Sequence, residues 1–387
     1  MAATTSGTPP GVLPLPPARD IPSTFVASMK SWWHAGEKES AAAEERLLRK
    51  LPFFRPAGSP PPTPDGTYQV VAESKRVELN NPKHYINTLT MTPTSRQLVL
   101  LHGYGAGLGF FFQNFLALGQ WASRRGTSVF ALDWLGMGRS ARVPFSIKAK
   151  RDDIDGRVNE AEGFFIDSLE QWRERMGLER MTLVGHSLGG YLSIILLSPA
   201  GVPRDPESTV YAREVTDEQT TGQLERIKTG QEEVQKKESR SRRLLTPFQV
   251  IRSSMFWGPM LVGKYSSRRF IGLSQDEPGR CTTTCEPRTC EGIGRVLRLT
   301  PARSGAHARR PLVDRIHALA MPITFVYGEH DWMDPEGGSE AIERLRQAGN
   351  GDGKMYIIPH AGHHVYLDNP KAVNDLLVKE LDRPLKA

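Results

Sequence analysis

Cysteine is scarce in this sequence, which has three cysteines, Cys281, Cys285 and Cys290, among 387 residues. A small and odd number of cysteines argues against a disulfide-rich secreted protein and favours a reducing compartment. The spacing of the three, without histidine partners, does not match that of a zinc site. We therefore expect no bound metal, and no motif indicates a cofactor.

Long apolar runs are lacking as well. No stretch approaches the roughly 18 residues that a membrane-spanning helix needs, and the N-terminus lacks the basic and then apolar order of a secretory signal. Hydrophobic residues make up only 39% of the chain, whereas glycine and proline are abundant, with 36 and 29 residues. We therefore expect an intracellular protein, peripheral to membranes, part of which is disordered.

Basic residues outnumber acidic ones, 50 against 43, and the formal net charge is +7. This charge favours an anionic partner such as acidic phospholipid or nucleic acid. No run of basic residues is interleaved with aromatic ones. Arg240, Arg242 and Arg243 follow a stretch rich in Glu and Lys that is typical of a solvated face. Nucleic acid is therefore not expected as a partner.

The N-terminal part divides into a tail and an arm. Residues 1–24 are rich in Pro, Thr and Ala, a composition that predicts a disordered tail, with a weak mitochondrial transit peptide as the alternative. Residues 25–67 form an arm that ends in a Pro-rich linker. Trp32 and Trp33 suit a membrane interface, so we expect the arm to associate with membranes, although the leucines of 40–51 could equally face a core.

The rest of the chain alternates between strand and helix patterns. Short apolar runs typical of buried strands occur at 97–101, 127–132, 181–184 and 323–327. Helical patterns at 112–124 and 160–176 lie between them, so a mostly parallel sheet is predicted, preceded by an antiparallel pair at 68–79 and 85–92. We expect residues 68–202 and 305–387 to form one α/β core, with 203–304 inserted as a helical cap over the sheet edge where ligands bind.

Ser187 is the candidate nucleophile. It lies in a GxSxG motif, residues 185–189, that directly follows the apolar strand 181–184. Small residues on both sides of a serine let the backbone turn sharply after a strand and expose the hydroxyl. Such a serine needs a base to take its proton and an acid to fix the tautomer of the base.

Asp331 and His363 are the candidate acid and base. Asp331 follows the strand 323–327, and His363 follows another apolar strand, 355–358. The chain order Ser, Asp, His is that of a known class of serine hydrolases. The alternatives that stay open are Asp334 for the acid and His360 or His364 for the base.

A glycine-rich stretch, residues 102–109, follows strand 97–101 at the place of an oxyanion loop. A tetrahedral intermediate needs amide donors for its negative oxygen. The backbone N–H groups of Tyr104 and Leu188 are the candidate donors. Asp133 comes before the nucleophile in the chain, and we expect it to stabilise the turn after its strand.

Four blocks resemble the α/β-hydrolase domain-containing proteins 4 and 5 and the fungal branch of that family: 102–109 (HGYGAGLG), 133–140 (DWLGMGRS), 170–192 and 362–368 (GHHVYLD). The resemblance implies the α/β-hydrolase fold, a mostly parallel sheet flanked by helices under a helical cap. It also implies a lipid acyl ester as substrate, as in phospholipid or cardiolipin deacylation, on an anionic membrane or a lipid droplet. A mitochondrion, a lipid droplet or otherwise the cytoplasm would be the location.

The family also carries an HxxxxD motif, here His363 and Asp368, that has been linked to lysophosphatidic acid acyltransfer. Some members have lost the nucleophile and act as lipase co-activators. Because Ser187 is intact, the resemblance favours a carboxylic ester hydrolase that works through an acyl-enzyme. Acyltransfer and a non-catalytic, membrane-binding role are the alternatives.

Two segments depart from the family pattern. Residues 191–197 run straight into a Pro-Gly turn, and seven residues are too few for a helix and a strand, so a segment of about 15 residues is missing behind the nucleophile. Residues 276–304 replace an apolar helical pattern with Thr, Arg, Pro and the cysteines, which is typical of a shifted reading frame. We expect both departures to impair folding or activity.

Overall fold

The computed structural model describes residues 24–34, 36–59, 70–92, 96–150, 152–204, 307–349 and 351–383, and also Leu15. Nearly all of the predicted tail and cap lie outside the described residues, as do segment 276–304, the three cysteines and the side chains of Trp32 and Trp33. Within the described ranges, no helix combines the length and the apolar character that a membrane crossing requires.

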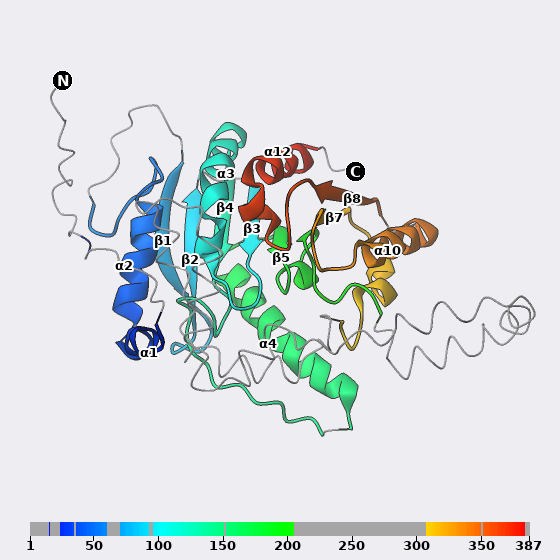
Figure 1. Ribbon diagram of the computed structural model, residues 1–387, viewed down its shortest axis with the longest axis horizontal. Coiled ribbons are helices and arrows are strands. Elements are labelled where there is room, and N and C mark those ends of the chain that lie inside the picture. The colour runs from blue at the N-terminus through cyan, green and yellow to red at the C-terminus, as the bar shows by residue number, and fades with distance from the viewer. Residues whose placement is uncertain are drawn as a thin grey trace, which may run out of the picture.

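One eight-stranded sheet runs through the centre of the domain (Figure 1). Its strands are β1 (Val71–Glu78), β2 (Tyr85–Thr92), β3 (Arg96–Leu101), β4 (Thr127–Leu132), β5 (Thr182–His186), β6 (Ile195–Leu197), β7 (Ile323–Gly328) and β8 (Gly353–Ile358). Their spatial order is β1-β2-β4-β3-β5-β6-β7-β8; the pairs β1–β2 and β2–β4 are antiparallel, and all later pairs are parallel. The predicted mostly parallel sheet is confirmed.

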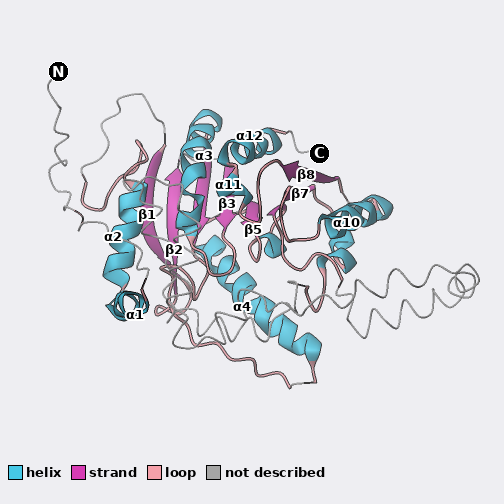
Figure 2. Cartoon of the chain, in the orientation of Figure 1, coloured by secondary structure: helices cyan, strands magenta, loops and turns pink. Residues whose placement is uncertain are grey.

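Helices cover both faces of this sheet (Figure 2). They are α1 (Phe25–His34), α2 (Glu37–Leu48), α3 (Phe112–Arg125), α4 (Ile154–Arg175), α10 (Pro335–Ala348), α11 (Val365–Asp368) and α12 (Pro370–Leu381). The helix predicted to begin at residue 160 begins at Ile154, because the Asp153 side chain accepts the N–H of Gly156 (2.8 Å) and caps the first turn. No sequence pattern indicated β6, α10 or α12.

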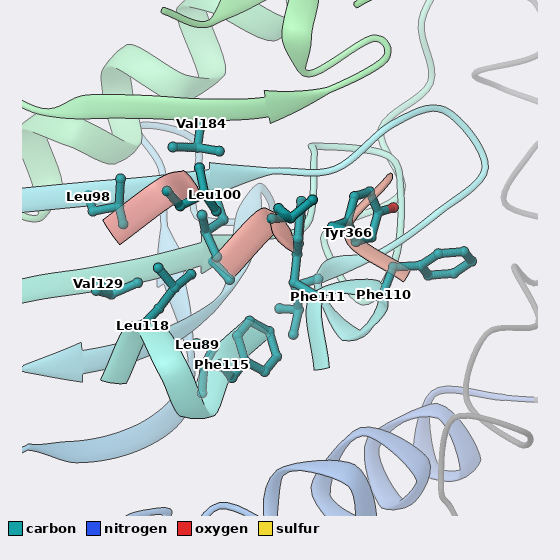
Figure 3. Packing of buried hydrophobic residues seen from close by; sticks show 14 of the residues in the cluster. Leu89, Leu98, Leu100, Phe110, Phe111, Phe115, Leu118, Val129, Val184 and Tyr366 are labelled. Carbon is teal, nitrogen blue, oxygen red and sulfur yellow. The ribbon is translucent and has the colours of Figure 1, made fainter. Parts of the chain in front are cut away.

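Successive side chains of the sheet point to opposite faces, as strand geometry requires. On β3, Leu98 and Leu100 pack in the cluster that holds α3 and α12, whereas Val99 and Leu101 pack in the cluster that holds α4. Figure 3 shows the first cluster, in which Phe115 of α3 lies against the sheet. Each face is therefore closed by a different helix layer, and the strand ends are free to carry loops.

Helix α2 is part of the folded domain. Leu47 and Leu48 are buried in the main core, so the leucines of this segment face the core. The buried carboxylate of Glu44 accepts hydrogen bonds from the Ser74 hydroxyl (2.8 Å) and from Arg139 Nη1 (2.6 Å). Burial raises the pKa of Glu44, although the charge of Arg139 opposes this effect. Membrane association stays a prediction for the rest of the arm.

Asp133, directly after β4, joins the two loops that flank the nucleophile. Its Oδ1 accepts the N–H of Leu108 (2.7 Å), and its Oδ2 accepts the N–H of Arg139 (2.8 Å) and the side-chain amide of Asn87 (2.9 Å). Only 2% of this residue is exposed. The expected role of Asp133 in stabilising its turn agrees with these contacts.

Replacing Asp133 with alanine should therefore destabilise the whole domain. The change leaves three donors without their acceptor in a buried site, and we expect the free energy of unfolding to fall by about 3 kcal/mol. Urea denaturation of the purified protein measures this. Asp375→Ala is the matched control, since Asp375 is an exposed carboxylate that pairs with Lys371, and should cost less than about 0.5 kcal/mol. Equal stability of the two variants would contradict the role of Asp133.

Candidate active site

Ser187 follows β5 directly and has a left-handed backbone, with a φ of 53°. The turn is closed by hydrogen bonds from Gly189 N to the His186 oxygen (2.8 Å) and from Tyr191 N to the Ser187 oxygen (3.1 Å). A Cβ atom on Gly185 would lie 2.1 Å from the Gly189 oxygen, so the first position of the motif has no room for a side chain. This strained, tightly packed turn is the geometry of a nucleophile elbow.

The segment after the elbow is short, as the sequence indicated. A single 3₁₀ turn, η2 (Gly190–Leu192), is the only helical structure between Ser187 and β6, and all of these residues are described. The end of β6 takes over the support of the nucleophile. Ser187 N donates to the Leu197 oxygen (2.9 Å), and Ala200 N donates to the Ser187 oxygen (3.2 Å). The backbone of Ser187 is therefore held on both sides without a following helix.

Tyr191 anchors this short segment to α4. Its hydroxyl donates to Glu162 Oε1 (2.6 Å) and also contacts Arg315, which itself pairs with Glu162 (2.9 Å). Burial raises the pKa of Tyr191, so the hydroxyl stays protonated. Burial also acts to raise the pKa of Glu162, but hydrogen bonds from Tyr191 and Arg315 lower it by more, so this carboxylate is ionised. No sequence pattern indicated this cluster, because its members come from distant segments.

Asp331 and His363 are in direct contact. Asp331 lies in the loop after β7 and His363 in the loop between β8 and α11, and His363 Nδ1 donates to Asp331 Oδ1 (3.1 Å). The same oxygen accepts the N–H of Met333 (3.1 Å). The side chain of Asp331 is 1% exposed and that of His363 is 12% exposed. Burial acts to raise the pKa of Asp331, but the hydrogen bond and charge of His363 outweigh it, so the carboxylate stays ionised.

The open alternatives for the acid and the base occupy other positions. The Asp334 side chain caps the N-terminus of α10. The side chain of His360 is 88% exposed. The ring of His364 packs between the rings of Phe110 and Tyr366. The contact geometry thus favours Asp331 and His363 over these three.

His186 links the elbow to the loop that carries the base. Its buried ring lies 4.7 Å from the ring of His363, and its Nε2 lies 2.9 Å from the His363 backbone oxygen. Burial, followed by the charges of His363 and His364, holds the pKa of His186 well below its usual range. A neutral ring next to a carbonyl oxygen must donate, so Nε2 carries the proton. No sequence pattern indicated a role for His186.

That hydrogen bond brings the His363 loop next to Ser187, one residue after His186. Among the described residues, no hydrogen bond joins the Ser187 hydroxyl to the His363 ring. Contacts of this kind often tighten only when substrate binds. The structure thus brings the candidate acid and base into contact and places the His363 loop next to the candidate nucleophile.

The predicted oxyanion loop lies against the elbow. A Cβ atom on Gly103 would lie 2.7 Å from His186 Nδ1 and 3.0 Å from the Cβ of Ser187. Within the described part of the chain, the N–H of Leu188 donates no backbone hydrogen bond, whereas that of Gly189 does. The position of Leu188 therefore suits an oxyanion donor. The role of Tyr104 stays a prediction from its place in the same loop.

His102 fixes the start of this loop. Its Nδ1 donates to the Gly103 oxygen (2.7 Å), and its Nε2 accepts the N–H of Trp134 (3.1 Å). Burial lowers the pKa of His102, with the nearby Asp133 carboxylate acting in the opposite direction. A neutral ring that donates at one nitrogen and accepts at the other satisfies both bonds.

Asp368, the acid of the HxxxxD motif, contacts the same loop as the base. Its Oδ2 accepts the N–H of Gly362 (3.0 Å), the residue before His363. Since α11 ends at Asp368, one short helical turn carries this carboxylate back towards the start of the loop. The contact holds the backbone that presents His363.

The sequence of this chain is similar to that of known proteins. Residues 98–376 match the alpha/beta hydrolase family. The chain is 32% identical over 356 residues to a protein of Arabidopsis thaliana named 1-acylglycerol-3-phosphate O-acyltransferase, with 85% of this chain and 77% of that protein covered.

Two animal proteins are similar over comparable lengths. The (lyso)-N-acylphosphatidylethanolamine lipase of Bos taurus is 30% identical over 335 residues, covering 80% of this chain and 86% of that protein. The 1-acylglycerol-3-phosphate O-acyltransferase ABHD5 of Sus scrofa is 30% identical over 310 residues, covering 73% and 76%. The similarity thus extends over most of each chain.

The tight contact between the oxyanion loop and the elbow predicts the effect of a methyl group there. Gly103→Ala should slow the reaction of Ser187 with a fluorophosphonate probe by about 100-fold or more, because the new Cβ displaces the loop that presents the amide donor. Labelling rates of the folded variant measure this. In the control Gly109→Ala, the added Cβ meets only Leu47 Cδ1 at 3.8 Å, and the rate should match wild type. Similar rates for both variants would contradict the packing argument.

Proposed function

The chain belongs to the alpha/beta hydrolase family, in the group of α/β-hydrolase domain-containing proteins 4 and 5, and we propose that it deacylates phospholipids through Ser187. The observation that carries this proposal is the hydrogen bond from His363 Nδ1 to the buried Asp331 carboxylate, in the loop beside the strained Ser187 turn. An ionised acid that holds the Nδ1–H of a histidine leaves its Nε2 free to act as a base.

The reaction follows from these positions. Ser187 loses its proton to His363 Nε2 as its oxygen bonds to the ester carbonyl carbon, and the N–H groups of Leu188 and Tyr104 stabilise the resulting oxyanion. The bond to the leaving alcohol then breaks, and the alcohol takes the proton from His363. Water, activated by His363, attacks the acyl-enzyme, releases the fatty acid and returns the proton to Ser187.

Two features support a phospholipid as the substrate. The similar proteins are named for a phosphatidylethanolamine-type lipase and for acyl transfer to an acylglycerol phosphate. The net charge of +7 favours an anionic surface. We therefore propose cardiolipin and other anionic phospholipids as the substrates to test first, with the protein acting peripherally on a mitochondrial or lipid-droplet surface.

Labelling with a fluorophosphonate probe tests the nucleophile. Wild-type protein should be labelled, and Ser187→Ala should not be. Asp331→Asn should fold but react on the order of 10⁴-fold more slowly, because His363 loses the acceptor that fixes its tautomer. Release of fatty acid from cardiolipin vesicles should be fastest for wild type, much slower for Asp331→Asn and absent for Ser187→Ala. Asp334→Asn is the control, and its rate should stay near that of wild type.

Absence of labelling would favour a non-catalytic role. A folded wild-type protein that is not labelled would contradict the hydrolase. Vesicle binding that survives Ser187→Ala in such a protein would then support a non-catalytic membrane or lipase co-activator role. The shortened segment after the elbow motivates this alternative.

Acyl transfer is the second candidate activity, because two of the similar proteins are named for it and His363 and Asp368 form an HxxxxD motif. The contact of Asp368 with Gly362 N predicts a positioning role, since it holds the His363 loop. Asp368→Asn should therefore lower hydrolysis and any acyl-CoA-dependent transfer together, by about 10-fold. Both rates can be measured on one preparation. Loss of transfer with full hydrolysis would instead support a separate acyltransferase role for Asp368.

A further inference from the structure

Trp332 is a large aromatic side chain exposed at the candidate site. Its exposed fraction is 53%, whereas its chain neighbours Asp331 and Met333 are buried. The ring of Trp332 lies 4.9 Å from that of His363, at an interplanar angle of 46°. About half of the indole surface therefore remains open after the contact with the base.

The fold builds this exposure into a rigid turn. Asp331 Oδ1 accepts the N–H of Met333, so the residues on both sides of Trp332 are anchored. Met333 packs in the cluster formed by η6 (Leu312–Asp314), η7 (Ile316–Ala318) and α10. With its two neighbours fixed inwards, the side chain of Trp332 projects outwards beside His363.

Three other residues also contact the His363 ring. Its Nδ1 contacts Asp331, and the rings of His186 and His364 lie 4.7 and 5.4 Å away. The Asp331 side chain and His186 are buried and His364 is partly buried, so Trp332 is the exposed partner of this ring. A substrate group that approaches His363 on the side of Trp332 therefore meets the indole.

The proposed reaction indicates which part of the substrate lies next to Trp332. The acyl carbonyl is held by the oxyanion donors of the 102–109 loop and the elbow, whereas His363 delivers its proton to the oxygen of the leaving alcohol. A side chain in contact with His363 is therefore next to the leaving group. Trp332 supplies a broad apolar surface with one donor, which suits the glycerol backbone and remaining chain of a lipid.

We propose that Trp332 is a specificity-determining residue that binds the lipid leaving group, through its exposed indole beside His363. This inference rests on the proposed function of Ser187. It assigns selectivity for a bulky, apolar alcohol to the loop after β7, separately from recognition of the acyl chain.

Two oleoyl esters with different alcohols test the proposal, ethyl oleate and tetraoleoyl cardiolipin in the same detergent micelles. Trp332→Ala should lower kcat/KM for cardiolipin by about 10-fold, the effect of losing contact with two or three methylene groups. The value for ethyl oleate should change by less than about 2-fold, and so should fluorophosphonate labelling, because fluoride is a small leaving group. Trp332→Phe should recover part of the loss.

Ile166→Ala is the matched control, since Ile166 is 46% exposed on α4 and does not belong to the site. It should leave the ratio of the two kcat/KM values unchanged. Equal losses for both esters in Trp332→Ala would overturn the proposal, because the ring would then act through His363 or the fold. A loss that depends on acyl length rather than on the alcohol would also overturn it. Failure of the proposed function is distinguishable, since wild type would then show no Ser187-dependent hydrolysis of either ester.

Discussion

The left-handed backbone of Ser187, with a φ of 53°, costs a residue other than glycine on the order of 1–3 kcal/mol and persists only where its surroundings enforce it. The β5–β6 pair supplies that enforcement. His186 and Leu197 are register partners, and each is followed by a serine with positive φ, Ser187 and Ser198. The Leu197 oxygen accepts the N–H of Ser187, so the two strained turns support each other. The placement of the nucleophile thus depends on the end of a strand.

This dependence explains how the nucleophile turn can form although the segment after it is short. A helix after the nucleophile contributes backbone hydrogen bonds and a dipole whose positive end faces the oxyanion. Here a 3₁₀ turn and the partly buried Tyr191–Glu162–Arg315 cluster replace the first contribution but not the second. The oxyanion would therefore rely on the individual N–H groups of Leu188 and the 102–109 loop. Folding and catalysis can therefore be affected separately here. The backbone of Ser187 keeps its hydrogen bonds, whereas the oxyanion lacks the stabilisation of a helix dipole.

Much of the fold could be predicted from the sequence because its signals are local. The apolar runs at β3, β4, β5 and β7 and the antiparallel pair were all placed correctly. β6 escaped because three residues carry no periodicity, and α10 and α12 lie in segments rich in charge. In the site, spacing and order were enough to select Ser187, Asp331 and His363 as candidates, and the structure places Asp331 and His363 in contact. The donor role of His186 and the exposure of Trp332 needed coordinates, because both depend on contacts between distant segments.

In the proposed reaction, hydrolysis and acyl transfer would share every residue of this site up to the acyl-enzyme. The two activities differ only in whether water or an alcohol attacks that intermediate, and His363 activates either one as a base. Asp331 keeps the base in the required tautomer in both cases, and Asp368 holds its loop through Gly362 N. The proposed triad would therefore serve either kind of activity for which similar proteins are named. The two activities would be separated by how well the part of the site that binds the leaving group binds an alcohol relative to water. Trp332, in contact with His363, lies in that part of the site.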